Sequence, residues 1–366
     1  IEPEIVIDGD KVNADMGGAN PEDVIAAWVA GDELVSLPTG GWAPIPIDWL
    51  DQYGDRLADL LAARDATGRV ARHALFDLAR LCEELDHPPP PQLAGVRALV
   101  DNFEGIPDAP IPEDFTGELR SYQQTGINWL TFLRNAEMGG VLADDMGLGK
   151  TIQALCMIRE KTLVVAPRSV LRNWENEAKR FRPELKVSIY HGPDRKLDQS
   201  SDLIITTFAL LRGDQEKLTK IKWDMVILDE AQAIKNPQSQ VAQAAFKIDA
   251  EFRLTLTGTP VENRLEELWS QMHFVNPGLL SGRKDFDERY AQPISRADAG
   301  VAKHLRERIR PFILRRLKKE VAPELPPRTE QILRCQLTGS EREVYNTVRV
   351  ATQAKLMERA GAPHVM

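Results

Sequence analysis

The sequence predicts an α/β fold in which a parallel sheet with flanking helices follows a small, mainly helical domain. Three observations support this prediction. Beyond residue 115, short apolar runs rich in β-branched residues alternate with longer amphipathic segments, which is the pattern of parallel strands joined by crossover helices. One of these runs leads into a glycine-rich loop that ends in Gly-Lys-Thr. Two helical patterns and two proline-rich stretches precede the sheet, and the net charge changes sign between the two parts of the chain.

Residues 1–110 are expected to form the helical domain. Apolar side chains recur at helical spacing in segments 48–65 and 68–85, so each segment has one apolar face. The faces consist of Leu50, Tyr53, Leu57, Leu60 and Leu61, and of Leu75, Leu78, Leu81, Cys82 and Leu85. The beginning of the domain is less regular, and the proline-rich stretches 87–92 and 104–114 are predicted to be connectors. No catalytic constellation is evident in this domain.

Charge divides the chain at the same place. Residues 1–110 carry 7 basic and 21 acidic side chains, a net charge of −14, whereas residues 111–366 carry 39 basic and 34 acidic side chains, a net charge of +5. The whole chain has a net charge of −9. We therefore expect the basic part to attract a phosphate backbone, and the acidic part either to restrain such binding or to recruit a basic protein partner.

Composition excludes several classes of protein. The chain is 43% hydrophobic and 28% charged, which is typical of soluble globular proteins. No run of about 18 apolar residues is present, so we expect no membrane partner, and the first ten residues lack the pattern of a secretory signal. Three cysteines, without CxxC spacing, argue against a zinc site or a disulfide framework. These features favour a cytoplasmic protein. The Ala- and Arg-rich composition indicates a bacterial source, and a bacterial protein of this kind would be associated with the nucleoid.

Five apolar runs are predicted to be strands of the sheet, and segments such as 169–181 between them are predicted to be crossover helices. The runs are 139–144, 162–167, 202–207, 224–230 and 253–260. Helices cover both faces of an open parallel sheet, and ligands bind beyond the carboxyl ends of its strands. Residues that follow these runs are therefore the candidates for a functional site.

The run 139–144 leads into a candidate phosphate-binding loop. The loop pattern is G-x-x-x-x-G-K-[ST], and Asp144 occupies the place of its opening glycine. Two glycines further along still allow successive backbone N–H groups to curl around phosphates. Lys150 would reach the β- and γ-phosphates, and the Thr151 hydroxyl would hold Mg²⁺. The predicted nucleotide contacts are Asp145, Met146, Gly147, Leu148, Gly149, Lys150 and Thr151. The alternative is that Gly-Lys-Thr only opens an ordinary helix.

A second motif favours the nucleotide site. Asp229 and Glu230 end a buried strand, 79 residues after Lys150, at the edge where ligands bind in open parallel sheets. Asp229 would take a water molecule bound to Mg²⁺, and Glu230 would orient or deprotonate the attacking water. Lys150, Asp229 and Glu230 are thus the candidate catalytic residues, and Thr151 and Asp229 are the candidate metal ligands. The alternative, an exposed turn after the strand, fits poorly with the apolar run before it.

Three long motifs occur in a fixed order: DDMGLGKT (144–151), DEAQAIKN (229–236) and LTGTPVEN (256–263). With these motifs, the chain from about Leu119 onwards resembles the Swi/Snf-type DNA-translocating ATPases of helicase superfamily two. In that family the opening position of the loop is routinely acidic, which accounts for Asp144.

The resemblance implies a domain organisation. Residues 115–335 would be a RecA-like P-loop lobe with a helical protrusion at about 275–320. Residues 336–366 would begin the connection to a second RecA-like lobe, which the sequence does not contain. Since the second lobe supplies arginine fingers, we expect the chain to be a fragment that hydrolyses almost no ATP alone.

The resemblance also implies roles for further residues. Gln123 would read the adenine edge, although its neighbour Ser121 stands where proline is more usual. Segment 312–327 would brace the lobe. If the resemblance is set aside, its basic residues Arg315, Arg316, Lys318 and Lys319 are predicted to form a basic helix face. The DNA backbone contacts would be Pro167, Arg168, Ser169, Thr206 and Thr207, for which plain strand-end structure is the alternative. The residues that would link the state of the bound phosphate to the DNA contacts are Thr257, Gly258 and Thr259.

The function expected from these inferences is that of an ATP-dependent double-stranded-DNA translocase, or helicase-like motor, that uses ATP and Mg²⁺. Its expected partners are double-stranded DNA, the second RecA-like lobe and a protein partner of the acidic domain. The alternative function is a docking or scaffold module in which the ATPase is vestigial. The presence of Lys150 and Glu230 argues against that alternative, because a degenerate site more often loses such residues.

Overall fold

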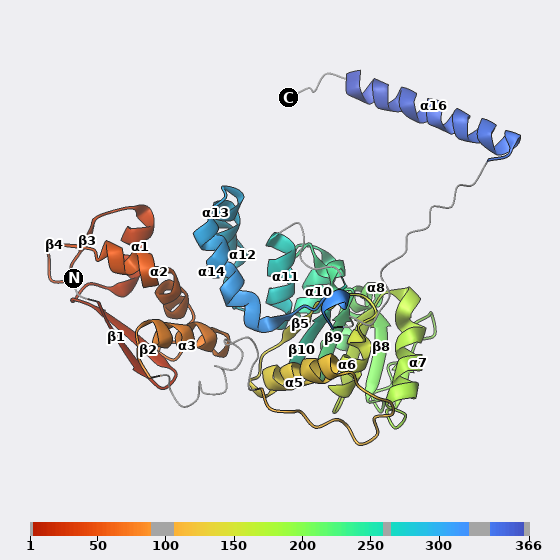
Figure 1. Cartoon of the computed structure of the whole chain (residues 1–366), viewed down its shortest axis with the longest axis horizontal. Helices are drawn as coiled ribbons and strands as arrows, with labels where there is room; N and C mark the ends of the chain where they lie inside the picture. Colours follow the sequence, from red (N-terminus) through yellow and green to blue (C-terminus); the bar gives the residue numbers. More distant parts are fainter. Residues whose placement is uncertain (1–2, 89–105, 259–264, 322–336, 362–366) are drawn as a thin grey trace. The chain divides into compact units, whose positions relative to one another are not determined.

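The computed structural model describes residues 3–88, 106–258, 265–321 and 337–361 (Figure 1). Contacts divide the chain into two compact units, Ile1–Val321 and Ala322–Met366. The described residues of the second unit include one long helix, α16 (Gly339–Gly361). The remaining elements belong to the first unit.

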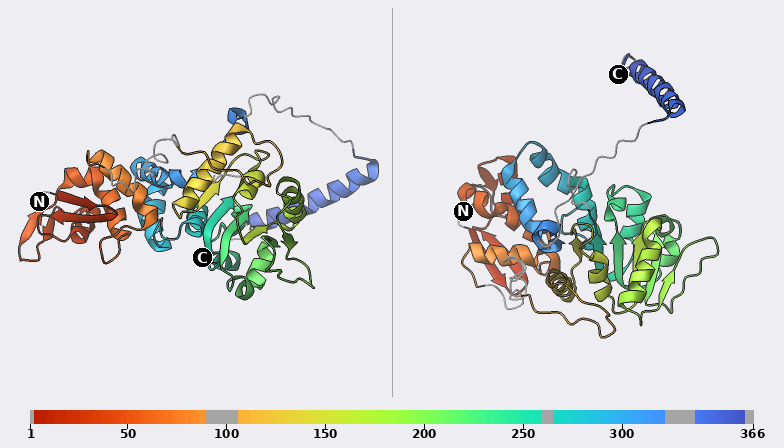
Figure 2. Two further views of the ribbon diagram at one scale, coloured as in Figure 1. Left: turned by 90° about the horizontal axis from the view of Figure 1, so that it is seen from below. Right: turned by 45° about the vertical axis from the view of Figure 1, so that its right-hand side comes forward.

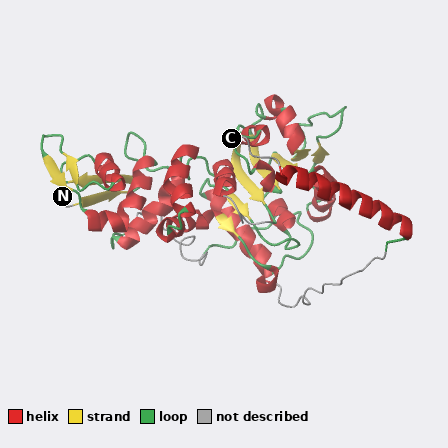
Figure 3. Cartoon of the chain, turned by 90° about the horizontal axis from the view of Figure 1, so that it is seen from above, coloured by secondary structure: helices red, strands yellow, loops and turns green. Residues whose placement is uncertain are grey.

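Among the described residues, seven parallel strands form the main sheet, in the order β11-β5-β10-β9-β6-β8-β7. Strands are yellow and helices red in Figure 3. This confirms the predicted α/β class with a parallel sheet. All five predicted runs contain strands, whereas β7 and β11, of three and two residues, were not predicted. The strands are β5 (Gly140–Leu142), β6 (Thr162–Ala166), β7 (Val187–Ile189), β8 (Leu203–Thr207), β9 (Trp223–Asp229), β10 (Ala250–Leu256) and β11 (Ile313–Leu314).

The inner strands are apolar because helices cover both faces of the sheet. Every residue of β6 and of β8 is buried, which explains why their sequences do not alternate between apolar and polar residues. Helix α5 (Ser121–Asn135) precedes the first strand of the sheet. The helices and helical turns that follow the strands are α6 (Lys150–Cys156), η3 (Arg168–Val170), α7 (Leu171–Phe181), α8 (Phe208–Gly213), α9 (Gln215–Leu218), η4 (Ala231–Ile234), α10 (Gln240–Phe246) and α11 (Leu265–Val275).

Strand register determines which residues meet at the carboxyl edge of the sheet. Leu256 of β10 pairs with Leu142 of β5 on one side and with Asp229 of β9 on the other. The loop after β5 and the residues after β9 therefore flank the residues after β10.

The helical protrusion predicted at about 275–320 is built from short helices. One of them is a π-helical turn, η5, and a longer helix, α14, follows it. The elements are α12 (Arg283–Phe286), η5 (Asp287–Ala291), α13 (Gln292–Ser295), α14 (Ala299–Ile309), η6 (Arg310–Phe312) and, after β11, α15 (Lys318–Val321).

The N-terminal region contains the two predicted helices and two β-hairpins (Figure 2). The hairpins occupy the stretch that the sequence analysis described as less regular. A two-residue turn with Gly9 at a φ of +63° joins the first pair of strands, which the Asp8-Gly9 sequence could have revealed. The elements are β1 (Pro3–Asp8), β2 (Lys11–Met16), α1 (Pro21–Ala30), β3 (Leu34–Ser36), β4 (Trp42–Pro44), α2 (Ile47–Ala62), η1 (Arg72–Ala74) and α3 (Leu75–Glu84).

A buried ion-pair cluster joins α2 to the protrusion. Asp59 of α2 has no exposed surface, and its carboxylate contacts Arg289 Nη2 at 2.5 Å, His304 Nε2 at 3.0 Å, the Tyr290 hydroxyl at 3.0 Å and the Arg308 guanidinium. A carboxylate removed from water in this way is stable only because several donors surround it. The N-terminal region and the protrusion are thus joined by interactions that depend on one carboxylate.

Candidate nucleotide-binding and coupling site

The loop after β5 has the backbone geometry of a phosphate cradle. Gly147 and Gly149 have φ values of +84° and +75°, which a residue with a Cβ rarely adopts. A Cβ on Gly149 would also overlap the side-chain amide of Gln123. Helix α6 begins at Lys150, directly after the second glycine.

The Lys150 ammonium lies inside this loop. Lys150 Nζ donates to the Asp144 carbonyl at 2.6 Å and to the Asp145 carbonyl at 3.3 Å. Burial lowers the pKa of Lys150, and the nearby carboxylates of Asp144, Glu230 and Asp229 oppose that shift. The loop, its lysine and the carboxylate pair are therefore in one electrostatic environment, although the sequence separates them widely.

Asp144, which replaces the opening glycine, has a structural role. Its carboxylate is fully buried and accepts from Arg316 Nε at 3.0 Å, Arg316 Nη2 at 2.5 Å and the Arg316 backbone N–H at 3.1 Å. Gln153 of α6 adds a donor at 3.4 Å. The acidic side chain thus anchors the loop to the segment that follows β11, while the curvature of the loop comes from its two later glycines.

Asp229 is held by two donors at the end of β9. Trp174 Nε1 donates to Asp229 Oδ2 at 2.8 Å, and the Glu230 backbone N–H donates to Asp229 Oδ1 at 3.0 Å. Burial raises the pKa of Asp229, the Trp174 bond lowers it, and the adjacent Glu230 charge raises it. Glu230 has a left-handed φ of +54°, and its Oε2 accepts from Gln232 Nε2 at 2.8 Å.

A third carboxylate, which the sequence analysis did not identify, faces the same place. Glu177 of α7 hydrogen-bonds to Thr151 and to Asn173, and burial raises its pKa with a further contribution from the Asp229 charge. Trp174 and Glu177 stand three positions apart on α7, so both point toward the sheet end. That spacing is the signal that could have revealed them.

The oxygen-bearing side chains at this site suit Mg²⁺ better than a metal ion whose ligands all come from the protein. Within the described ranges, no three His, Cys, Asp or Glu side chains are grouped closely enough to hold a metal ion. Mg²⁺ usually keeps several waters and binds one or two carboxylates together with substrate phosphates. The Thr151 hydroxyl and the Asp229 carboxylate, beside a phosphate loop, fit that requirement.

Gln123 connects the start of α5 to the phosphate loop. Its Oε1 accepts from the Arg120 N–H at 2.9 Å, and its Nε2 donates to the Leu148 carbonyl at 3.2 Å. A carboxamide has a second N–H and a second lone pair, so the side chain retains the capacity to bond an adenine edge. Its position beside Leu148 and Gly149 places any such contact next to the phosphates.

Two of the three predicted coupling residues, Thr257 and Gly258, lie between the phosphate loop and the carboxylates. The Thr257 N–H donates to the Leu142 carbonyl at 3.2 Å, which continues the ladder between β10 and β5. A Cβ on Gly258 would lie 2.9 Å from Met146 Cγ and 3.8 Å from Lys150 Nζ, so this glycine lies directly against the loop. Thr259 lies outside the described residues.

The expected DNA contacts fall into two groups. Arg168 and Ser169 are exposed after β6, and Pro167 is partly exposed before them. Thr206, however, is fully buried and donates its hydroxyl to the Tyr190 carbonyl at 2.9 Å. The Thr207 hydroxyl is nearly buried and accepts from the Leu210 N–H at 3.3 Å, which caps α8. Both hydroxyls thus have internal partners, as the strand-end alternative describes, and contact of Thr206 and Thr207 with DNA stays a prediction.

The basic segment after residue 312 is not a continuous helix face. Residues 313–314 form strand β11, and helix α15 begins only at Lys318. Arg316 is turned inward onto Asp144, whereas Arg315 is exposed. Arg315, Arg316, Lys318 and Lys319 therefore do not form one basic helix face, because an edge strand interrupts the predicted helix.

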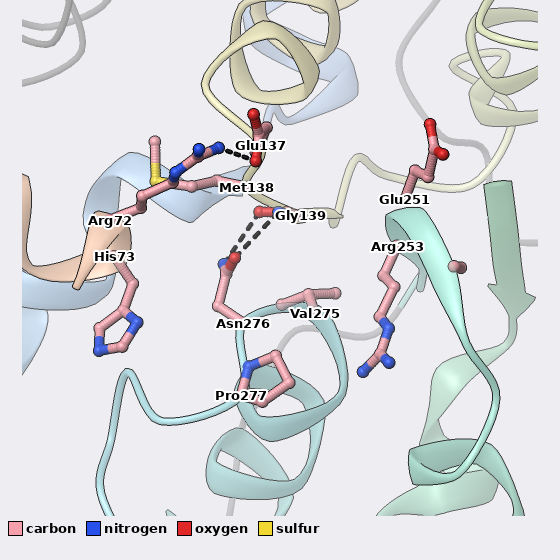
Figure 4. Close-up of a pocket in the computed structure, with 11 residues that line it drawn as sticks. Arg72, His73, Glu137, Met138, Gly139, Glu251, Arg253, Val275, Asn276 and Pro277 are labelled. Carbon is pink, nitrogen blue, oxygen red and sulfur yellow. Dashed lines mark hydrogen bonds and ion pairs between the residues drawn. The ribbon is translucent and has the colours of Figure 1, made fainter. Parts of the chain in front are cut away.

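A separate hollow lies at the opposite edge of the sheet (Figure 4). Its volume is about 240 Å³, and its lining includes Gly139 just before β5 and Ala250 at the start of β10. Asn276 donates to the Gly139 carbonyl at 3.0 Å and accepts from its N–H at 2.9 Å. Ligands of open parallel sheets bind at the carboxyl edge, so this hollow does not belong to the candidate site.

None of the helices described has the length and apolarity to cross a membrane.

Comparison with known proteins identifies relatives for most of the chain. Residues 122–364 match the SNF2-related domain family. The putative ATP-dependent helicase/translocase YwqA of Bacillus subtilis is 40% identical over 273 residues, which cover 69% of this chain and 30% of YwqA. The helicase domino of Drosophila melanogaster is 33% identical over 381 residues, which cover 94% of this chain and 11% of that protein. This chain thus spans less than one third of the length of these relatives.

Solved structures agree with this result. The SWI2/SNF2 ATPase core of Sulfolobus solfataricus in complex with double-stranded DNA is 38% identical, with a TM-score of 0.56, and the match covers 65% of this chain and 54% of that chain. The same core domain solved separately gives a TM-score of 0.55 at 38% identity, covering 64% of this chain and 51% of that chain. The seven-stranded parallel sheet therefore has the RecA-like architecture of an ATPase core.

Proposed function

The chain belongs to the SNF2-related family of helicase superfamily two ATPases, and from this premise we propose that it supplies the ATP-binding lobe of a motor that tracks along double-stranded DNA. The observation that carries the proposal is the position of Thr257. It follows Leu256, which is in register with both Leu142 and Asp229, so it stands between the phosphate loop and the carboxylate pair. A residue so placed can transmit the phosphate state to neighbouring strand ends.

In this proposal, the nucleotide is ATP and its phosphates enter the loop of Gly147 and Gly149. Lys150 exchanges its two carbonyl acceptors for phosphate oxygens, and Glu230 orients the attacking water or accepts its proton. Thr151 and Asp229 hold Mg²⁺, which would supply charge neutralisation at the phosphates. Gln123 reads the adenine edge from its place beside Leu148.

The proposed DNA contacts are Pro167, Arg168 and Ser169, at the end of β6. An exposed arginine, a hydroxyl and backbone N–H groups at a strand end suit a phosphate backbone, and they carry no base specificity. The relative from Sulfolobus was solved with double-stranded DNA, which supports duplex as the substrate. A second RecA-like lobe would complete the ATP site with arginine fingers, which contribute on the order of 10³–10⁵ in rate in related sites.

The test is ATP hydrolysis by the complete protein at low salt, without nucleic acid, with single strands and with linear duplex. Strong stimulation by duplex is expected, and it should disappear in Glu230→Gln. Arg168→Ala should weaken duplex binding and reduce its salt dependence, whereas Arg172→Ala, which removes an exposed arginine paired with Glu175, serves as the control. Hydrolysis that ignores nucleic acid would contradict the proposal and favour the docking module with a vestigial ATPase.

A further inference from the structure

The segment Leu314–Lys318 is bonded to the phosphate loop along its length. The Ala143 N–H donates to the Leu314 carbonyl at 2.8 Å, and the Asp145 N–H donates to the Arg316 carbonyl at 3.1 Å. The Lys318 N–H donates to Asp145 Oδ2 at 2.9 Å. This segment therefore continues the parallel pairing of β11 with β5 beyond the ends of both strands, and follows the loop toward its glycines.

Arg316 fixes the course of this segment. Its guanidinium binds Asp144, donates to Gln153 Oε1 at 2.8 Å and to the Tyr122 carbonyl, and lies 5.4 Å from the centre of the Tyr122 ring. The side chain is only 11% exposed, and a Cβ on Gly126 of α5 would lie 2.9 Å from Arg316 Nη2. The arginine is thus held between α5, α6 and the loop, so the residues after it have a defined direction.

Two residues further on, Lys318 reaches the glycine turn of the loop. A Cβ on Gly147 would lie 3.2 Å from Lys318 Nζ and 3.5 Å from Lys318 Cε. The absence of a side chain at Gly147 therefore leaves room for the lysine. No carboxylate among the described residues lies within ion-pair distance of this ammonium, in contrast to Arg316.

We propose that Lys318 is a second phosphate-binding cation of the nucleotide site, brought to the loop by the Asp144–Arg316 pair. The inference rests on the proposed nucleotide site and extends it to a residue outside the loop motif. A polyphosphate carries several negative charges, and one half-buried ammonium, Lys150, leaves most of them without a protein partner. A second ammonium beside the glycine turn supplies a charge-assisted hydrogen bond to the same group. Lys318 is thus a binding residue and Arg316 is its positioning residue.

The test compares nucleotide affinities of this chain and four variants, Lys318→Ala, Lys318→Arg, Lys319→Ala and Lys150→Ala, by titration with ATP, ADP and adenosine in the presence of Mg²⁺. Lys318→Ala should weaken ATP binding roughly tenfold, which is the loss of one charge-assisted bond, and should leave adenosine binding unchanged. Lys318→Arg should retain most of the affinity. Lys319→Ala is the matched control, because Lys319 is the adjacent exposed lysine and no hydrogen bond or ion pair of the described residues joins its side chain to the loop, so its affinities should equal those of the wild type.

The outcomes separate this inference from the proposed function. If Lys150→Ala loses ATP binding while Lys318→Ala binds ATP as the wild type does, the inference is overturned and the nucleotide site stands. If Lys150→Ala also binds ATP normally, the site assignment fails together with the inference. A Lys318→Ala variant that loses adenosine binding as well, or melts at a lower temperature without nucleotide, would show a structural role and overturn the phosphate contact. A selective loss of ATP and ADP affinity supports it.

Discussion

Replacing Asp144 with glycine restores the usual loop pattern, and we predict that it damages the site. The carboxylate of Asp144 is fully buried, and the Arg316 side chain that it binds is only 11% exposed. Removing one partner of such a pair costs about 3–5 kcal/mol, because the other charge remains in a place that water hardly reaches. We expect the lower end, about 3 kcal/mol, since Gln153 and the Tyr122 carbonyl still accept from the guanidinium.

The assay measures both stability and nucleotide affinity. A loss of about 3 kcal/mol corresponds to a fall in melting temperature of roughly 6–12 °C for a domain of 150–250 residues. ATP affinity should also fall, because the loop loses its anchor to the segment after β11. Arg316→Met combined with Asp144→Gly should cost less than the sum of the single changes, since neither charge is then left alone. Unchanged stability with tighter ATP binding in Asp144→Gly would refute this reasoning.

Three further predictions concern buried groups elsewhere. Asp59→Ala should lower the melting temperature through a loss of about 3–5 kcal/mol, because Arg308 loses its buried partner, while ATP affinity should persist; equal melting curves would contradict this. Burial raises the pKa of Asp77 from 3.8 to about 6, so the folded state binds the proton more tightly and stability falls as pH rises through this window. Between pH 5 and pH 7.5 the wild type should lose about 1.4 kcal/mol that Asp77→Asn does not lose, as parallel unfolding titrations would show. Trp174→Phe removes only the N–H that orients Asp229, so the Mg²⁺ concentration needed for ATP binding should rise about tenfold, and an unchanged requirement would count against the assignment.

The sheet could be predicted because its central strands are buried on both faces. β6, β8, β9 and β10 therefore appear in the sequence as apolar runs long enough to be distinguished from helices. The edge strands β7 and β11 could not be predicted in this way, since three and two residues are too few to be distinguished from other short apolar stretches. The hairpins near the N terminus were missed for another reason: their strands alternate weakly, and only a short turn marks the first of them.

Some residues of the candidate site could likewise be predicted from the sequence, and others could not. Residues that stand in consecutive positions of a loop, such as Gly147 to Thr151, or that end a buried strand, such as Asp229 and Glu230, could be found by spacing alone. Arg316 could not, because it reaches the site only through tertiary packing, and Glu177 could be found only from its helical spacing to Trp174. The hydroxyls of Thr206 and Thr207 show a different limit of spacing, since a strand end can use such groups internally, for a carbonyl or a helix cap.

Besides its contact with Gln123 of α5, the phosphate loop contacts two other parts of the lobe through different groups. Gly258, at the end of β10, lies against Met146 and Lys150, so it meets the side of the loop that faces the carboxylates. The Leu314–Lys318 segment binds Asp144 and Asp145, and no bond described there involves the Lys150 side chain. A change of Lys150 should therefore act most directly on the contact with Gly258, whereas a change of Arg316 should act most directly on the contact with Asp144. A nucleotide that fills the loop acts on both contacts at once, and this provides a physical route by which one phosphate group can influence both the strand-end residues and the segment that follows the last strand.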